Sequence, residues 1–132
     1  MNFVDIKNTI MNSLLWTGQI ILAAILLYSG INKSIYSEKE LIARGQTGVV
    51  GRPAATIRFI GISEIIGFFG VILPWWTNTL SFLTPVTAAC FAMIMLLAAP
   101  IHYRLRESRN VALNCVLLAI ALFVVWGRCR QL

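Results

Sequence analysis

The segment IRFIGISEIIGFFGVILPWW, residues 57–76, decides the fold. After Arg58 at its start it carries a single charged residue, Glu64. A helix of about 20 mostly apolar residues is long enough to cross the hydrocarbon core of a bilayer. A helix is also the natural form in lipid, because it satisfies its own backbone hydrogen bonds. We therefore predict a transmembrane helix over 57–76.

Three further apolar segments lie on either side of this one, and none of them contains a charged residue: 14–32, 79–101 and 111–127. Across the 132 residues, 58% are hydrophobic and only 12% are charged, about half the charged share of a soluble domain. The sequence therefore predicts an all-α protein, an antiparallel bundle of four transmembrane helices. Residues 1–132 form a single integral membrane domain, with no room for a soluble catalytic domain beside the spans.

The charges predict how the bundle lies in the membrane. Eight Lys and Arg residues fall near the connections after the first and third segments, and three fall near the termini: Lys7, Arg128 and Arg130. The excess of positive charge on connecting loops usually marks the cytoplasmic side, which places both termini outside. We attribute the net charge of +6 to this orientation of the helices in the membrane, and we expect no nucleic-acid partner. No small-residue cleavage site follows the first segment, so we expect it to remain as a span.

The connections carry local structural signals. Pro74 predicts a tight turn over 74–78 between the second and third spans. Ser37 and Glu40 have the spacing of a capping box, which predicts a short interfacial helix after them. Gly45, Gly48 and Gly51 predict a flexible segment behind that helix.

The sequence offers no familiar redox or metal motif. Cys90, Cys115 and Cys129 form no Cys-x-x-Cys pair, so a dithiol centre is unsupported. One histidine with one intramembrane acid gives too few ligands for a metal, and we expect no metal site.

Glu64 is the most informative residue, because an ionisable group inside a span is costly and usually has a partner and a function. Lys33 is the better-placed partner, at the end of a polar and small-residue stripe on the first span. Gly61 and Gly67 lie beside Glu64 and leave space for a neighbouring helix or a ligand. An alternative is that Glu64 and Lys33 form a buried pair that only fixes helix register.

Polar residues from all four spans are expected to meet in one half of the bundle, and Gln19 lies at the opposite end of the first stripe. We predict a ligand-binding set consisting of Lys33, Arg58, Glu64, His102, Asn114 and Gln19. Glu64 and His102 are the candidates for acid–base chemistry. The apolar part of the ligand is expected among Phe59, Phe68, Phe91 and Met93. Taken singly, these polar residues are also typical interface anchors or interhelical hydrogen-bonding groups.

The order of these residues resembles that of a known family. Ser29-Gly30 with Lys33, then Arg58, Gly61, Glu64, Gly67 and Pro74, then His102 and Gly127-Arg128, resembles the DoxX-like family of small four-span membrane proteins over about residues 16–128. The resemblance implies a four-helix bundle in the bacterial inner membrane. It implies no single function: some members are subunits of quinone-linked sulfur-oxidising enzymes, some belong to membrane oxidoreductase complexes of thiol defence, and a distant animal relative is an assembly chaperone.

These observations favour a protein that binds an amphipathic small molecule, a quinone or a lipid, in a polar cavity open to the bilayer. It would act as part of a membrane oxidoreductase system, with quinone as the one cofactor considered. Two alternatives stay open. One is a non-catalytic small subunit or assembly chaperone, bound to a larger membrane protein or to further copies of itself. The other is a membrane enzyme that uses Glu64 as acid or base.

Overall fold

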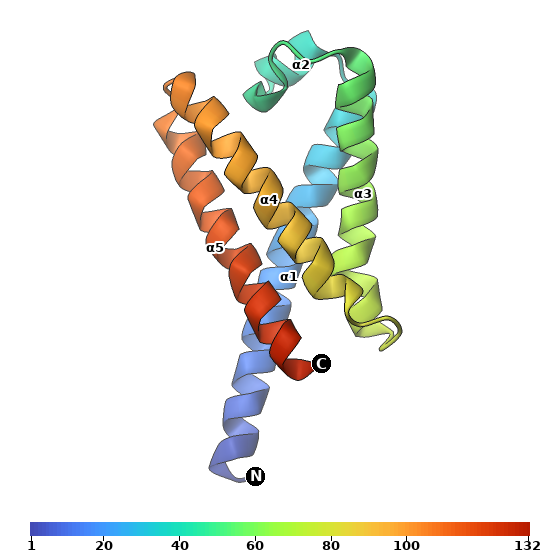
Figure 1. Cartoon of the computed structure of the whole chain (residues 1–132), viewed down its shortest axis with the longest axis vertical. Helices are drawn as coiled ribbons and strands as arrows, with labels where there is room; N and C mark the ends of the chain where they lie inside the picture. The colour runs from blue at the N-terminus through green and yellow to red at the C-terminus, as the bar shows by residue number, and fades with distance from the viewer.

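The computed structural model describes all residues from 1 to 132 and contains only helices (Figure 1). Four of them are long and apolar enough to cross a membrane, which confirms the predicted all-α, four-span architecture. In chain order the elements are α1 (Phe3–Ile35), α2 (Glu38–Ala43), the short 3-10 helix η1 (Thr47–Val49), α3 (Ala54–Trp76), α4 (Leu83–Arg104) and α5 (Ser108–Gln131).

Helices α1, α3 and α5 begin before the apolar segments that predicted them, and α1, α4 and α5 continue past the ends of theirs. Helix α1 begins at Phe3, where Asn2 and Asp5 form a reciprocal capping box: Asp5 N–H donates to Asn2 Oδ1 at 2.9 Å, and Asn2 N–H donates to Asp5 Oδ2. The first turns of α1 project beyond the other helices (Figure 1). Both termini lie at the same end of the bundle (Figure 1), as an even number of spans requires.

The predicted tight turn over 74–78 is wrong. Pro74 lies inside the last turn of α3, where its fixed φ is compatible with a helix and only one backbone hydrogen bond is lost. The chain reverses over residues 77–82, with Asn78 and Leu80 at positive φ. Helix α4 therefore begins at Leu83 instead of near residue 79.

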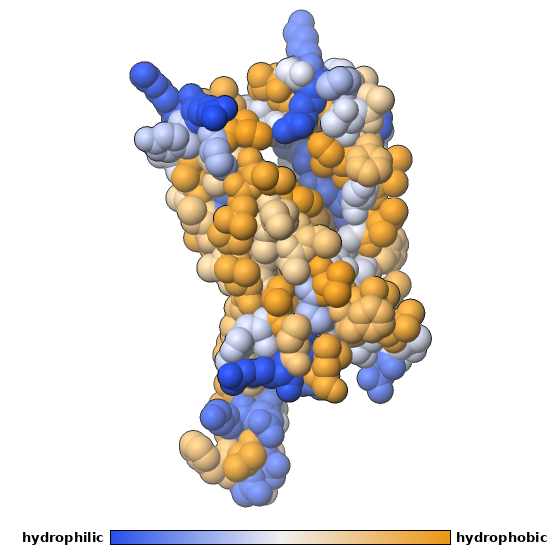
Figure 2. All heavy atoms as spheres, viewed as in Figure 1, coloured by the Kyte–Doolittle hydropathy of each residue, from blue (hydrophilic) through white to orange (hydrophobic).

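The four long helices form two antiparallel pairs, α1 with α3 and α4 with α5. The pairs lie close together near the termini and diverge toward the end that carries α2 (Figure 1). Their shared core contains small and aliphatic side chains with one aromatic ring: Leu22, Ala23, Leu26, Val71, Ala88, Phe91, Ala92, Leu117, Ala121 and Val124. On the face shown in Figure 2, hydrophobic atoms cover the middle of the molecule, and hydrophilic atoms gather toward its two ends.

The backbones of α1 and α3 approach most closely where Gly30 faces Gly61. A Cβ added to Gly61 would lie 2.8 Å from Lys33 Cβ and 2.9 Å from the Gly30 carbonyl oxygen. Small residues at such crossings let membrane helices pack backbone to backbone. This contact fixes how the polar residues of α1 meet those of α3.

The segment between α1 and α3 folds back over the open end of the bundle. The predicted capping box is present: Ser37 N–H donates to Glu40 Oε2 at 2.9 Å and starts α2. Leu41, Val49 and Ile57 form a small second core. The segment is therefore anchored in place, although Gly45 and Gly51 both adopt the positive φ that glycine allows.

Candidate functional site

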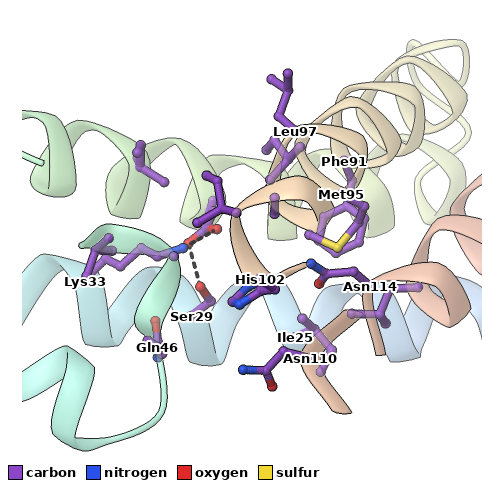
Figure 3. Close-up of a pocket in the computed structure, with 18 of the residues that line it drawn as sticks. Ile25, Ser29, Lys33, Gln46, Phe91, Met95, Leu97, His102, Asn110 and Asn114 are labelled. Carbon is purple, nitrogen blue, oxygen red and sulfur yellow. Dashed lines mark hydrogen bonds and ion pairs between the residues drawn. The ribbon is translucent and has the colours of Figure 1, made fainter. Parts of the chain in front are cut away.

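A cavity of about 610 Å³ lies between the two helix pairs at the end where they diverge (Figure 3). All four long helices and the segment from Arg44 to Arg52 contribute to its wall. Its apolar part includes Phe59 of α3 and Leu97 of α4, which are 72% and 66% exposed on the surface. In the space-filling view, hydrophilic atoms are visible within a hollow at this end of the molecule (Figure 2). The cavity is thus open toward the lipid between α3 and α4.

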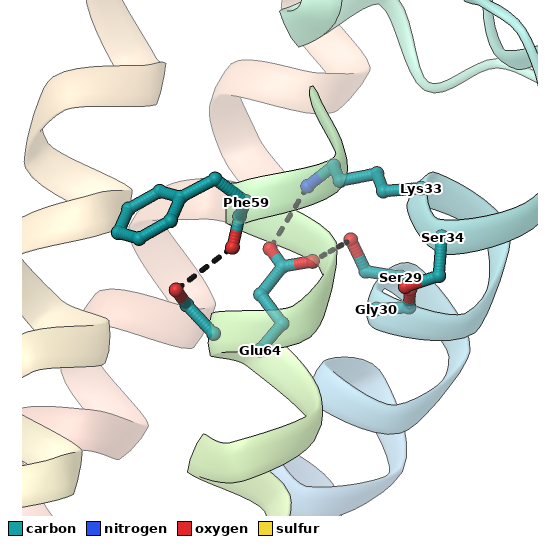
Figure 4. A network of polar contacts seen from close by, with 7 residues as sticks. Ser29, Gly30, Lys33, Ser34, Phe59 and Glu64 are labelled. Carbon is teal, nitrogen blue, oxygen red and sulfur yellow. Dashed lines mark hydrogen bonds and ion pairs between the residues drawn. The ribbon is translucent and has the colours of Figure 1, made fainter. Parts of the chain in front are cut away.

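One polar group of the cavity joins α1 to α3. Lys33 Nζ lies 2.8 Å from Glu64 Oε1, and Ser29 Oγ donates to Glu64 Oε2 at 2.9 Å (Figure 4). The Glu64 side chain is only 5% exposed. The pairing of Glu64 with Lys33 agrees with the sequence prediction. Because both carboxylate oxygens accept hydrogen bonds, this charge is held firmly inside the span.

A second polar group joins α4, α5 and η1 at the mouth of the cavity. His102 Nδ1 lies 2.7 Å from Glu107 Oε2, and the same oxygen accepts hydrogen bonds from Thr47 Oγ1 at 2.7 Å and Asn110 Nδ2 at 3.0 Å. The hydrogen bond from His102, then those from Thr47 and Asn110, lower the pKa of Glu107 from 4.5 to about 2. Glu107 is therefore a carboxylate at neutral pH, and it ties the folded-back segment to α4 and α5.

The lowered pKa of Glu107 predicts how this contact responds to acid. A carboxyl whose pKa is lower in the folded than in the unfolded chain adds stability above its ordinary value of 4.5, and loses it as pH falls toward 2. In protein labelled with 13C at glutamate side chains, we expect one carboxyl signal to titrate near pH 2. Replacing Glu107 by Gln identifies that signal by its disappearance. A midpoint near 4.5 would mean that Glu107 does not hold Thr47 and His102 in solution.

Several polar atoms on the cavity wall have no hydrogen-bond partner in the protein. Asn114 is 8% exposed, and its Nδ2 is buried without a partner. The side-chain nitrogen and oxygen of Gln46 are also buried without a partner. Buried polar groups are usually hydrogen-bonded. These atoms are therefore free to form hydrogen bonds inside the cavity.

The structure brings together four of the six residues predicted to bind a ligand. Lys33, Glu64, His102 and Asn114 line the cavity, whereas Arg58 and Gln19 do not. Arg58 Nη1 instead donates to the backbone carbonyls of Lys33 at 2.6 Å and Tyr36 at 2.7 Å. It thus satisfies carbonyls at the C-terminal end of α1, where a cation is also favoured by the helix dipole.

Gln19 belongs to a separate polar cluster near the termini. Its Nε2 donates to the Val71 carbonyl at 2.7 Å, and its Oε1 accepts from Arg128 Nε at 2.6 Å. Arg128 is fully buried. Its Nη1 donates to Asn12 Oδ1 at 2.7 Å, and its guanidinium lies 4.3 Å from the centre of the Trp75 ring. No carboxylate pairs with it, so neutral oxygens and aromatic faces stabilise this charge.

The predicted apolar wall is also only partly correct. Phe59 and Phe91 line the cavity. Phe68 instead packs against the main core, and Met93 is 58% exposed on the outer side of α4. Met95, two residues further along α4 and so on its opposite face, contributes to the wall in its place.

Sequence reasoning missed Glu107, Thr47, Gln46, Asn110 and Ser29. The sequence did contain a pattern that could have identified Ser29, because it lies four residues before Lys33 and so shares its helix face. No sequence pattern could have identified Glu107 and Thr47, because they meet only after the loops fold back.

No group of three or more His, Cys, Asp and Glu side chains is placed to hold a metal ion. The three cysteines are free and exposed.

Comparison with known proteins gives one match. The sequence model of a family described as the DoxX-like family matches residues 17–124, which include all of α3 and α4 and the greater part of α1 and α5. No curated protein and no solved structure matches the chain.

Proposed function

The chain belongs to the DoxX-like family, and on that basis we propose that it is a membrane protein that binds an amphipathic small molecule, a quinone or a lipid. The binding site is the cavity between the two helix pairs. The observation that carries the proposal is a cavity with a polar inner wall and an apolar opening toward the bilayer.

The size and lining of the cavity suit such a ligand. Pockets for small molecules usually measure about 300–1,000 Å³ and combine apolar walls with a few placed polar groups, and this cavity of about 610 Å³ lies within that range. The head of the ligand would lie among Lys33, Glu64, His102 and Asn114. Its apolar chain would leave between α3 and α4, past Phe59.

The unpartnered atoms fit a quinone as well as a lipid. Asn114 Nδ2 is a buried donor without an acceptor, and a carbonyl oxygen of a quinone head would supply one. A bound quinone would supply electron-transfer chemistry, and the residues of this chain would orient its head and exclude water. We place the protein in the bacterial inner membrane, as a component of an oxidoreductase system.

A second candidate function, a small subunit or assembly factor, is favoured by the first turns of α1. These turns project beyond the bundle (Figure 1), and they expose Phe3, Val4, Ile6 and Ile10. A photo-cross-linker at Ile6 in native membranes would capture a specific partner if this function is correct. The third candidate is an enzyme with Glu64 as acid or base, and in it Glu64 would act while Ser29 and Lys33 each hold one of its oxygens.

Filling the cavity should remove the ligand. Ile94 lines the cavity and is 36% exposed, whereas its neighbour Met93 is 58% exposed and does not line it. We expect Ile94→Trp to abolish co-purification of a stoichiometric amphiphile, because the indole occupies the apolar part of the site. Met93→Trp should retain it. Native mass spectrometry in mild detergent, with identification of released lipids and quinones, measures both.

Comparing Ile94→Trp with Met93→Trp shows whether a bound amphiphile occupies the cavity. Equal ligand content in the two folded variants would place any bound amphiphile outside the cavity. A wild-type protein that carries no ligand, and takes up none of the quinones and lipids offered, would overturn the proposal. It would favour the partner-subunit function.

A further inference from the structure

Glu107 determines which nitrogen of the His102 ring carries the hydrogen. The Glu107 carboxylate can only accept hydrogen bonds, so a contact of 2.7 Å from Nδ1 requires the hydrogen on Nδ1. In the neutral imidazole this leaves a lone pair on Nε2. The second ring nitrogen is therefore a hydrogen-bond acceptor.

His102 Nε2 is free to receive a donor from the cavity. His102 lines the cavity, and no protein group forms a hydrogen bond with Nε2. Gly48 faces this nitrogen, and a Cβ added there would lie 3.7 Å from Nε2. The absence of a side chain at Gly48 keeps this nitrogen accessible.

Asn114 provides the complementary donor on the neighbouring helix. Its Nδ2 is buried without a partner, and Asn114 on α5 lines the same cavity as His102 on α4 (Figure 3). A hydroxyl is the group that can donate to one atom and accept from another. It would satisfy both His102 Nε2 and Asn114 Nδ2.

Resting on the proposed function, we infer that this part of the cavity recognises the hydroxyl group of a neutral amphiphile. The hydroxyl donates to His102 Nε2 and accepts from Asn114 Nδ2. An anionic head would be disfavoured here, because the Glu107 carboxylate lies directly behind the imidazole ring. Three cations line other parts of the wall: Lys33, which is paired with Glu64, and Arg44 and Arg52 of the folded-back segment.

A matched pair of probes tests this inference in nanodiscs: para-dodecylphenol and its methyl ether. The two share an apolar tail, and only the phenol can donate to Nε2. We expect the phenol to bind about fivefold or more tightly, the effect of losing one hydrogen bond in a buried site. Gly48→Ala should reduce this preference toward unity, because its methyl group shields Nε2. That methyl makes only an ordinary van der Waals contact, so the fold should be retained.

Glu107→Gln should preserve the chemistry of the subsite. The side-chain amide oxygen of the variant can take the place of Oε2, where Thr47 Oγ1 and Asn110 Nδ2 already donate, and it still accepts the hydrogen on His102 Nδ1. Because His102 is the only histidine, imidazole 15N NMR reports its tautomer without ambiguity. We expect Nδ1–H in the wild type and in the variant. The variant should therefore retain the preference for the phenol over the ether.

The outcomes separate the inference from the proposed function. Equal affinity for phenol and ether in the wild type would overturn the hydroxyl subsite and leave the amphiphile-binding function intact. A wild-type Nε2–H tautomer would likewise overturn the subsite. Binding of neither probe, nor of any lipid or quinone, would overturn both.

Discussion

Replacing Gly61 by alanine is expected to destabilise the bundle by about 2–3 kcal/mol, in the range for overpacking a tight interface. A Cβ at this position would lie 2.9 Å from both the Gly30 carbonyl oxygen and the Ser34 backbone nitrogen. Backbone atoms of a packed helix cannot move aside as the end of a flexible side chain can. Helices α1 and α3 must therefore separate, and the contacts that hold Lys33 against Glu64 must loosen.

Unfolding in mixed micelles with increasing dodecyl sulfate measures this loss, and Gly67→Ala is the matched control. Gly67 lies on the same helix, but its added Cβ would meet Leu26 Cδ1 at 3.5 Å, an ordinary van der Waals distance. We expect Gly67→Ala to unfold close to the wild type. Similar unfolding of the two variants would show that the α1–α3 crossing is looser than the structure indicates.

Replacing Lys33 by methionine is expected to cost about 2–3 kcal/mol of stability. Breaking a buried ion pair by removing one partner typically costs about 3–5 kcal/mol, and the 15% exposure of Lys33 reduces that figure through solvent screening. The variant leaves the Glu64 carboxylate inside the span with only the Ser29 hydroxyl as a partner. The effect comes from an unpaired charge, since methionine retains most of the apolar stem.

The double variant Lys33→Met with Glu64→Met distinguishes this cause from lost packing. When both charges of a buried pair are replaced by apolar groups, the loss is often small. We expect the double variant to recover to within about 1 kcal/mol of the wild type, again in the dodecyl sulfate assay. If the double variant is as unstable as the single one, the attraction between Lys33 and Glu64 stabilises the bundle by more than the free energy needed to bury the two charges.

The sequence predicted the four spans well because each apolar run reports directly how much chain lies in lipid. It predicted the helix ends poorly, because hydropathy shows which residues lie in the membrane and not where the backbone hydrogen bonds of a helix begin and end. The mixed polar and apolar residues before residue 14 also belong to α1, since the Asn2 capping box starts the helix at Phe3. Pro74 was misread as a turn because a proline near a helix end often stops a helix, yet here the helix continues to Trp76.

The candidate site could be predicted where its residues lie at helical spacing and similar depth. Lys33 and Glu64 met both conditions, and the structure pairs them. Arg58 lies near the same depth but six positions before Glu64, on a different part of the helix surface, and its guanidinium binds carbonyls at the end of α1. Glu107 depended on the path of a loop, which spacing along a helix does not describe.

The buried guanidinium of Arg128 has a consequence for how the protein is made. Its partners Asn12 and Gln19 lie on the first helix, and the hydrogen bond to Gln19 joins residues separated by 109 positions. During synthesis the first helix enters the membrane with the Gln19 side-chain oxygen unmatched, and it stays so until the end of α5 emerges from the ribosome. A nascent chain that stops short of Arg128 thus keeps an exposed polar group in lipid, a mark by which membrane quality control can distinguish it from the finished bundle.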